Sequence, residues 1–151
     1  MKASTTVYLI SAITMVALIG FIPTYFSKFP EFEGLKNIHH FHGAMMTGWF
    51  GMLIAQPVLI SYKKVDWHRM LGKASYVVAP LVAISIYLMM RAEYYDDLAE
   101  STRERSLAGL DLDFMSLLSF IILYSLAVFY RRKTDHHMRY MICTGLLIFI
   151  P

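Results

Sequence analysis

Four long runs without any Asp, Glu, Lys or Arg constrain this chain more than any other feature of its sequence. A helix needs about 20 residues to cross about 30 Å of hydrocarbon, because each residue adds about 1.5 Å. The first two runs exceed that length. The last two hold 17 residues each, and flanking Tyr, Arg and Lys side chains can extend them by reaching toward the headgroups. We therefore predict an all-α, polytopic transmembrane helix bundle with four full spans, at about residues 4–26, 40–62, 73–91 and 113–130.

The composition agrees with a membrane protein. Hydrophobic residues make up 57% of the chain and charged residues only 17%, whereas soluble domains carry about 25% charged residues. The basic residues form no continuous stripe or arm, which excludes the usual pattern of a nucleic-acid binder. The lipid bilayer is the partner that this composition predicts.

A fifth apolar run, residues 140–151, holds only 12 residues and is too short to cross. A chain ending there would leave a carboxylate and unpaired carbonyls in hydrocarbon. We therefore predict that residues 139–151 are the incomplete start of a fifth span, and that 1–151 is a single transmembrane domain truncated at its C-terminus. A half-inserted terminal helix is the alternative. The first run lacks a small-x-small cleavage site, which favours an uncleaved first helix.

The charges between the spans predict the orientation, because cytoplasmic loops of membrane proteins are rich in Lys and Arg. With a cytoplasmic N-terminus, the inner segments hold nine basic and two acidic residues, and the outer segments hold five basic and nine acidic ones. The inner basic residues are Lys2, Lys63, Lys64, Arg69, Lys73, Arg131, Arg132, Lys133 and Arg139. The longest outer segment, residues 91–113, is predicted to be an acidic loop, partly amphipathic at the membrane surface.

Small residues and prolines predict how the helices pack. Gly43, Thr47, Gly51 and Ala55 are each four positions apart in the second span, and such a stripe lets another backbone approach closely. Pro57 and Pro80 predict bends in the second and third spans. Gln56, beside the first bend, is predicted to satisfy a freed carbonyl or to face a polar cavity.

The six histidines fall into an outer and an inner group. His42 and His68 bracket the second span, and 26 residues of helix separate them by about 39 Å, so they cannot share one metal ion or haem. In the outer group, His42 with His39 (or His40) is a candidate metal site, and an interfacial histidine belt is the alternative.

The inner group repeats a pattern at two predicted helix starts. Asp66-Trp67-His68-Arg69 opens the third helix, and Asp135-His136-His137-Met138-Arg139 opens the fifth. Each Asp is expected to be an N-cap, which places each histidine in the first turn. The second and third helices form one hairpin and the fourth and fifth form another, and the two hairpins would then be repeats of the same orientation.

Three interpretations of this inner pattern stay open. The histidines and arginines can simply lie among the lipid headgroups. Alternatively, Arg69, Arg139 and the histidines can form a site for an anionic lipid or a quinone headgroup, since helix N-termini favour negative charge. In the third, His68 and His137 (or His136) are the axial ligands of a b-type haem.

The order of these motifs resembles a group of uncharacterised bacterial inner-membrane proteins. The resemblance covers residues 38–145 and rests on His42-Gly43, Trp49, Gln56, His68-Arg69-x-x-Gly72, Ala79-Pro80 and His137-x-Arg139-x-Met141. It implies a multi-pass protein of the bacterial inner membrane that continues past the last motif. A more distant likeness is to di-haem membrane cytochromes b. Because the third and fourth spans contain no histidine, at most one inner haem is expected.

The sequence thus predicts an integral membrane protein with an inner-face His/Arg ligand site and leaves its activity and any enzymatic role open. One alternative is haem- or quinone-linked electron transfer. The other is a small transporter or assembly partner, in which Gln56 and the two bends would mark a polar path. No charged residue lies in any span, which counts against ion coupling.

Overall fold

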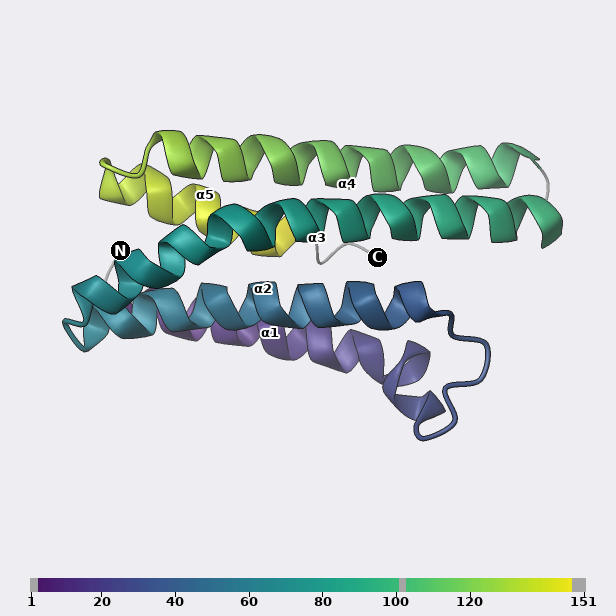
Figure 1. Cartoon of the computed structure of the whole chain (residues 1–151), viewed down its shortest axis with the longest axis horizontal. Helices are drawn as coiled ribbons and strands as arrows, with labels where there is room; N and C mark the ends of the chain where they lie inside the picture. Colours follow the sequence, from purple (N-terminus) through teal and green to yellow (C-terminus); the bar gives the residue numbers. More distant parts are fainter. Residues whose placement is uncertain (1–2, 101–102, 148–151) are drawn as a thin grey trace.

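The computed structural model describes residues 3–100 and 103–147, and in them the chain is entirely helical apart from its connections (Figure 1). The predicted all-α bundle is therefore confirmed. The α-helices are α1 (Ala3–Thr24), α2 (Asn37–Ser61), α3 (Val65–Glu100), α4 (Arg103–Phe129) and α5 (Thr134–Leu147), and a short 3-10 helix, η1 (Phe26–Lys28), follows α1.

Three helical segments are long and apolar enough to cross a membrane: Asn37–Ser61, Val65–Leu98 and Gly109–Phe129. A shorter apolar segment, Val7–Pro23, lies in α1. The chain is therefore compatible with contact with a lipid bilayer along most of its length.

Successive helices run in alternating directions. The start of α1 and the α2–α3 and α4–α5 connections lie at one end of the bundle, which we call the basic end (Figure 1). The α1–α2 connection and the adjoining ends of α3 and α4 lie at the other, which we call the acidic end. Residues predicted to share one side of the membrane therefore share one end of the fold.

The core is centred on Trp49 of α2, whose side chain is fully buried. Its ring lies edge-on to Phe120 and Tyr124 of α4, at centroid distances of 5.3 and 5.6 Å. Its Nε1–H donates to Oγ1 of Thr144 in α5 at 3.3 Å. Three helices are therefore joined at one residue. Close packing continues at Gly145, where an added Cβ would lie 2.9 Å from Cδ1 of Leu53.

The segment predicted as an acidic loop is helical instead. Residues 91–100 continue α3 and residues 103–113 belong to α4, because no Gly or Pro interrupts the first of these stretches. A helix of 36 residues is about 54 Å long, so α3 is much longer than the hydrocarbon is thick. Lys36, directly before α2, forms an ion pair with Asp96 of this extension at 2.6 Å.

The predicted N-caps are also corrected. α3 begins at Val65 and α5 at Thr134, so Asp66 and Asp135 lie inside the first turn rather than before it. A carboxylate in that turn still stabilises the helix, because the backbone N–H groups there carry partial positive charge.

The glycines of the small-residue stripe do not contact another helix of this chain. Nothing lies within 4 Å of a Cβ added at Gly43 or Gly51, so no described part of the chain approaches them. That another backbone packs closely against these glycines stays a prediction, and that backbone would have to lie outside the described part of the chain. Both prolines lie within continuous helices, Pro57 in α2 and Pro80 in α3. Figure 1 shows α3 bending in its first half, toward α2.

Candidate functional site at the basic end

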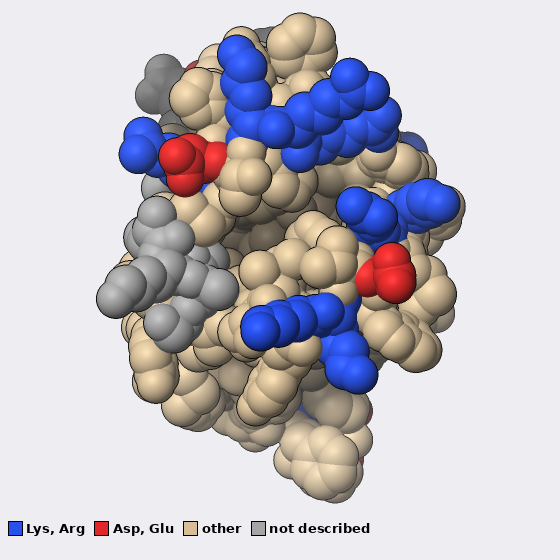
Figure 2. All heavy atoms as spheres, turned by 90° about the vertical axis from the view of Figure 1, so that its left-hand side faces the viewer, with Lys and Arg blue, Asp and Glu red and all other residues tan. Residues whose placement is uncertain are grey.

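Lys and Arg side chains gather on the basic end, with few acidic residues among them (Figure 2). One group comes from the α2–α3 connection and the start of α3, and the other from the α4–α5 connection and the start of α5. The surface is hollowed between blue side chains on either side (Figure 2). Nη1 of Arg131 donates to the hydroxyl of Tyr76 at 2.8 Å, which ties the second group to α3.

His68 and His137 occupy equivalent positions in their helices. Each is the fourth residue of its helix. The backbone N–H of His68 donates to the carbonyl of Lys64, and that of His137 to the carbonyl of Lys133, both at 3.0 Å. His137, rather than His136, is therefore the structural counterpart of His68.

The two neighbouring histidines of α5 face different surroundings. His136 is exposed, and its ring lies against Tyr130 at a centroid distance of 5.4 Å. His137 is half-buried and turns into the bundle. Of these two histidines, His137 therefore lies within the bundle and His136 on its surface.

The imidazole of His137 is held in one tautomer. Its Nδ1 lies 2.8 Å from the backbone carbonyl of Ala127, and a carbonyl oxygen only accepts hydrogen bonds. Nδ1 therefore carries the proton, and in the neutral ring Nε2 keeps a lone pair. Histidines that bind metals are usually held in this way, with the second ring nitrogen donating to a carbonyl or carboxylate.

His68 lies near both His137 and Gln56 at this end of the bundle. Its Nδ1 is buried and has no hydrogen-bond partner among the described groups.

Gln56 packs on the start of α3. Its Nε2 would lie 3.7 Å from a Cβ added at Gly72, one turn beyond His68. Its Oε1, like Nδ1 of His68, is buried without a partner among the described residues. Two unpaired polar atoms therefore belong to neighbouring side chains at the same end of the bundle.

The arginines proposed for the same site lie outside this pair of imidazoles. Arg69 and Arg139 are exposed, whereas both histidines are half-buried. The basic end therefore has an inner layer of two imidazoles and an amide, and an outer layer of guanidinium and ammonium groups. Such an outer layer favours anionic groups at the surface.

His68 and His137 are the half-buried histidines of this end that could hold a metal-containing group. In the part of the chain that the structure describes, no three His, Cys, Asp or Glu side chains are grouped so as to hold a metal ion. A structural zinc site takes four protein ligands, whereas the iron of a b-type haem takes two histidines. A haem at this end would take His68 and His137.

The outer histidines each have a separate partner. Nδ1 of His39 accepts the backbone N–H of Lys36 at 2.9 Å, and Nδ1 of His40 lies 2.7 Å from the hydroxyl of Tyr25. Nδ1 of His42 lies 3.2 Å from Oγ of Ser85. A metal site at His42 and His39 stays a prediction.

The sequence analysis did not identify the serine hydroxyl groups that form hydrogen bonds between helices. The hydroxyls of Ser85 and Ser75 donate to the carbonyls of Val82 and Gly72 of their own helix, at 2.8 and 2.6 Å. Each therefore accepts from the neighbouring helix, Ser85 from His42 and Ser75 from Tyr124 (2.9 Å). Polar residues inside apolar runs were the available signal.

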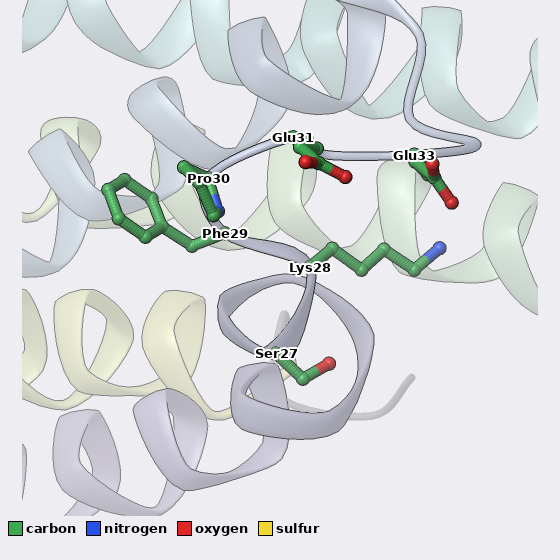
Figure 3. Close-up of a pocket in the computed structure, with 6 residues that line it drawn as sticks. All are labelled: Ser27, Lys28, Phe29, Pro30, Glu31 and Glu33. Carbon is green, nitrogen blue, oxygen red and sulfur yellow. The ribbon is translucent and has the colours of Figure 1, made fainter.

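A separate, open pocket of about 370 Å³ lies at the acidic end. The connection between α1 and α2 forms it, and the lining residues are Ser27, Lys28, Phe29, Pro30, Glu31 and Glu33. Lys28 and Glu33 extend toward the same side in Figure 3, whereas Phe29 points the other way. The pocket contains no histidine and is not part of the site at the basic end.

Comparisons with models of protein families, with curated proteins and with solved structures find no match for this chain. The geometry of the basic end therefore carries the functional argument.

Proposed function

We propose that the chain crosses the bacterial inner membrane four times, with α1 as the fourth span and the basic end in the cytoplasm. α1 has 22 residues, about 33 Å of helix, which suffices for the hydrocarbon. α1 starts at the end where Lys and Arg gather (Figures 1 and 2), and such ends stay in the cytoplasm. The resemblance to bacterial inner-membrane proteins is part of the same proposal.

Exposed aromatic residues support this placement. Tyr62, Trp67 and Phe129 are exposed near the basic end, and Phe29 and Phe114 near the acidic end. Aromatic side chains are enriched at both interfaces of a bilayer. Residues 114 and 129 are separated by about 22 Å along α4, within the hydrocarbon thickness of about 30 Å.

We further propose that the protein transfers electrons through a b-type haem held by His68 and His137. The observation that carries this proposal is the neighbouring pair of inward imidazoles at equivalent helix positions, with Nε2 of His137 kept unprotonated by the carbonyl of Ala127. When bound, the haem iron supplies one-electron chemistry. The surrounding Lys and Arg side chains would attract its propionates.

The absorption spectrum of the purified protein tests this proposal. We expect a Soret band and a sharp α-band after reduction with dithionite, with both lost or strongly weakened in His68→Ala and His137→Ala. His136→Ala is the matched control, because its ring is exposed beside the site, and it should keep the wild-type spectrum. A featureless spectrum from full-length protein expressed with ample haem supply would refute the proposal.

A further inference from the structure

A hydrogen bond between α3 and the α4–α5 connection places a cation beside an exposed phenol. Nη1 of Arg131 donates to the hydroxyl of Tyr76 at 2.8 Å, and both side chains are exposed. A hydroxyl that accepts one bond can still donate its own proton, and this bond uses one of the five N–H donors of the guanidinium. The pair therefore offers several donors and a positive charge on the outer side of the bundle.

Lys73 adds a second cation on the same face of α3. It is exposed and lies three residues before Tyr76, and residues three apart are neighbours on a helix surface. Lys73 directly precedes the uncharged run 74–90, and Arg131 directly follows the uncharged run 114–130. In the membrane placement proposed above, the three polar groups therefore lie where both helices leave the hydrocarbon, at the level of the lipid headgroups.

Farther from the basic end, this face of α3 becomes apolar. Positions three or four residues apart share one face of a helix. One such series is exposed at every position: Arg69, Lys73, Tyr76, Pro80, Ile84 and Tyr87. From Tyr76 to Ile84 the helix rises about 12 Å, which lies within the depth of about 15 Å that one leaflet contributes to the hydrocarbon. A single exposed face thus combines cations and a phenol at the membrane surface with apolar side chains below them.

We propose that Lys73, Tyr76 and Arg131 bind the phosphate of an anionic phospholipid, whose acyl chains lie along Pro80 and Ile84. The site depends on the membrane placement of the basic end but not on the haem. Phosphate oxygens accept hydrogen bonds from a guanidinium, an ammonium group and a phenol. Two cations around one phosphate favour an anionic lipid over a zwitterionic one. The apolar continuation of the face favours a lipid over a soluble phosphate.

Native mass spectrometry of the full-length protein in an uncharged detergent tests this site, by counting bound lipids during titration with phosphatidylglycerol or phosphatidylcholine. We expect wild-type protein to bind one phosphatidylglycerol more tightly than phosphatidylcholine. Tyr76→Phe should weaken phosphatidylglycerol binding by about 10-fold, because it removes a hydrogen bond to a charged acceptor. Arg131→Gln and Lys73→Gln should each weaken it by about 5-fold or more.

Two matched controls separate a defined site from attraction by total charge. Tyr87→Phe makes the same change at an exposed tyrosine of the same face, near the acidic end, and should leave binding unchanged. Arg132→Gln removes the same charge as Arg131→Gln from the neighbouring exposed residue and should lose less. Should Arg131→Gln not fold, the comparison of Tyr76→Phe with Tyr87→Phe decides, because neither changes the charge.

Three results would overturn the lipid site. The first is wild-type affinity in Tyr76→Phe, and the second is an equal loss in Arg131→Gln and Arg132→Gln, since either leaves only attraction by total charge. The third is full competition by soluble glycerol phosphate, which would show that the acyl chains play no part. Each of these results leaves the proposed haem site unaffected.

Discussion

Hydrogen-bond direction is the property of single residues that decides what this site can do. A carbonyl that only accepts assigns the proton of His137 to Nδ1. In the same way, the hydroxyl of Ser85 donates to the carbonyl of Val82 and must therefore accept from His42. These assignments follow from the hydrogen-bond partners alone. They leave Nε2 of His137 and Nε2 of His42 unprotonated in the neutral ring.

Gly145 gives a residue-scale test of the packing around Trp49. A valine there would place its Cβ 2.9 Å from Cδ1 of Leu53, and overpacking of this kind costs about 1–3 kcal/mol. We expect Gly145→Val to lower the melting temperature in detergent. The double variant with Leu53→Ala should lose less than the sum of the two single changes.

Gly48 is the matched control, because an added Cβ there meets nothing within 4 Å. Gly48→Ala should leave the melting temperature unchanged or raise it, since alanine favours a helix more than glycine does. Equal losses at Gly48 and Gly145 would contradict the packing described here.

At the scale of elements, the charged ends of α3 and α4, residues 91–100 and 103–113, are helical rather than a loop. The ion pair between Lys36 and Asp96 joins this extension to the start of α2. Both side chains are about half exposed, at 56% and 51%, so the pair contributes less than about 1 kcal/mol. The position of the extension depends mainly on the continuity of the two helices.

Water-soluble maleimide measures where α3 leaves the bilayer. In a Cys143→Ser background, a cysteine at Asp97 should react rapidly, because the extension stands in water. A cysteine at Ile84, exposed on the same helix, should be protected by lipid. Similar rates at both positions in intact membranes would mean that α3 does not span there.

The ion pair makes a separate prediction. Asp96→Asn should change the melting temperature by no more than a few degrees, and raising the ionic strength should abolish the difference, because salt screens exposed charges. A large loss that persists in high salt would show that this contact organises the fold.

For the whole molecule, the alternating helices place all segments of one charge character at one end. Among residues 3–100 and 103–147, eight of the thirteen basic residues belong to segments of the basic end, and nine of the eleven acidic residues to the other. Because cytoplasmic segments of membrane proteins are rich in Lys and Arg, this separation predicts that the basic end lies in the cytoplasm.

An impermeant thiol reagent applied to intact cells tests this orientation, again in a Cys143→Ser background. Lys64→Cys in the α2–α3 connection should remain unlabelled until the cells are opened. Glu33→Cys in the α1–α2 connection should be labelled at once. The reverse pattern would place the pair His68 and His137 outside the cytoplasm.

Helix positions were largely predictable, and one class of boundary was not. The second span was predicted at 40–62 and is Asn37–Ser61, since uncharged runs of hydrocarbon length leave few alternatives. The continuation of α3 to Glu100 was missed. Hydrophobicity marks where a helix leaves lipid, but a polar helix in water ends only where its backbone is interrupted.

The candidate site was predictable in its residues but not in its geometry. The repeated Asp-x-His pattern indicated His68 and His137, with His136 as the alternative. The position of α5 against α4 brings His137 to the carbonyl of Ala127. The exposed state of Arg69 and Arg139 likewise depends on how the helices meet.

Hydrophobic length and charge distribution act along the chain, so the helical class and the grouping of charges at two ends follow from the order of residues. The hydrogen-bond partner of His137 and the burial of each side chain depend on atoms from different helices. These contacts join residues distant in sequence, and no periodicity within one helix specifies its rotation against the next. Packing therefore decided that His137 turns toward the carbonyl of Ala127 while Arg69 and Arg139 stay exposed.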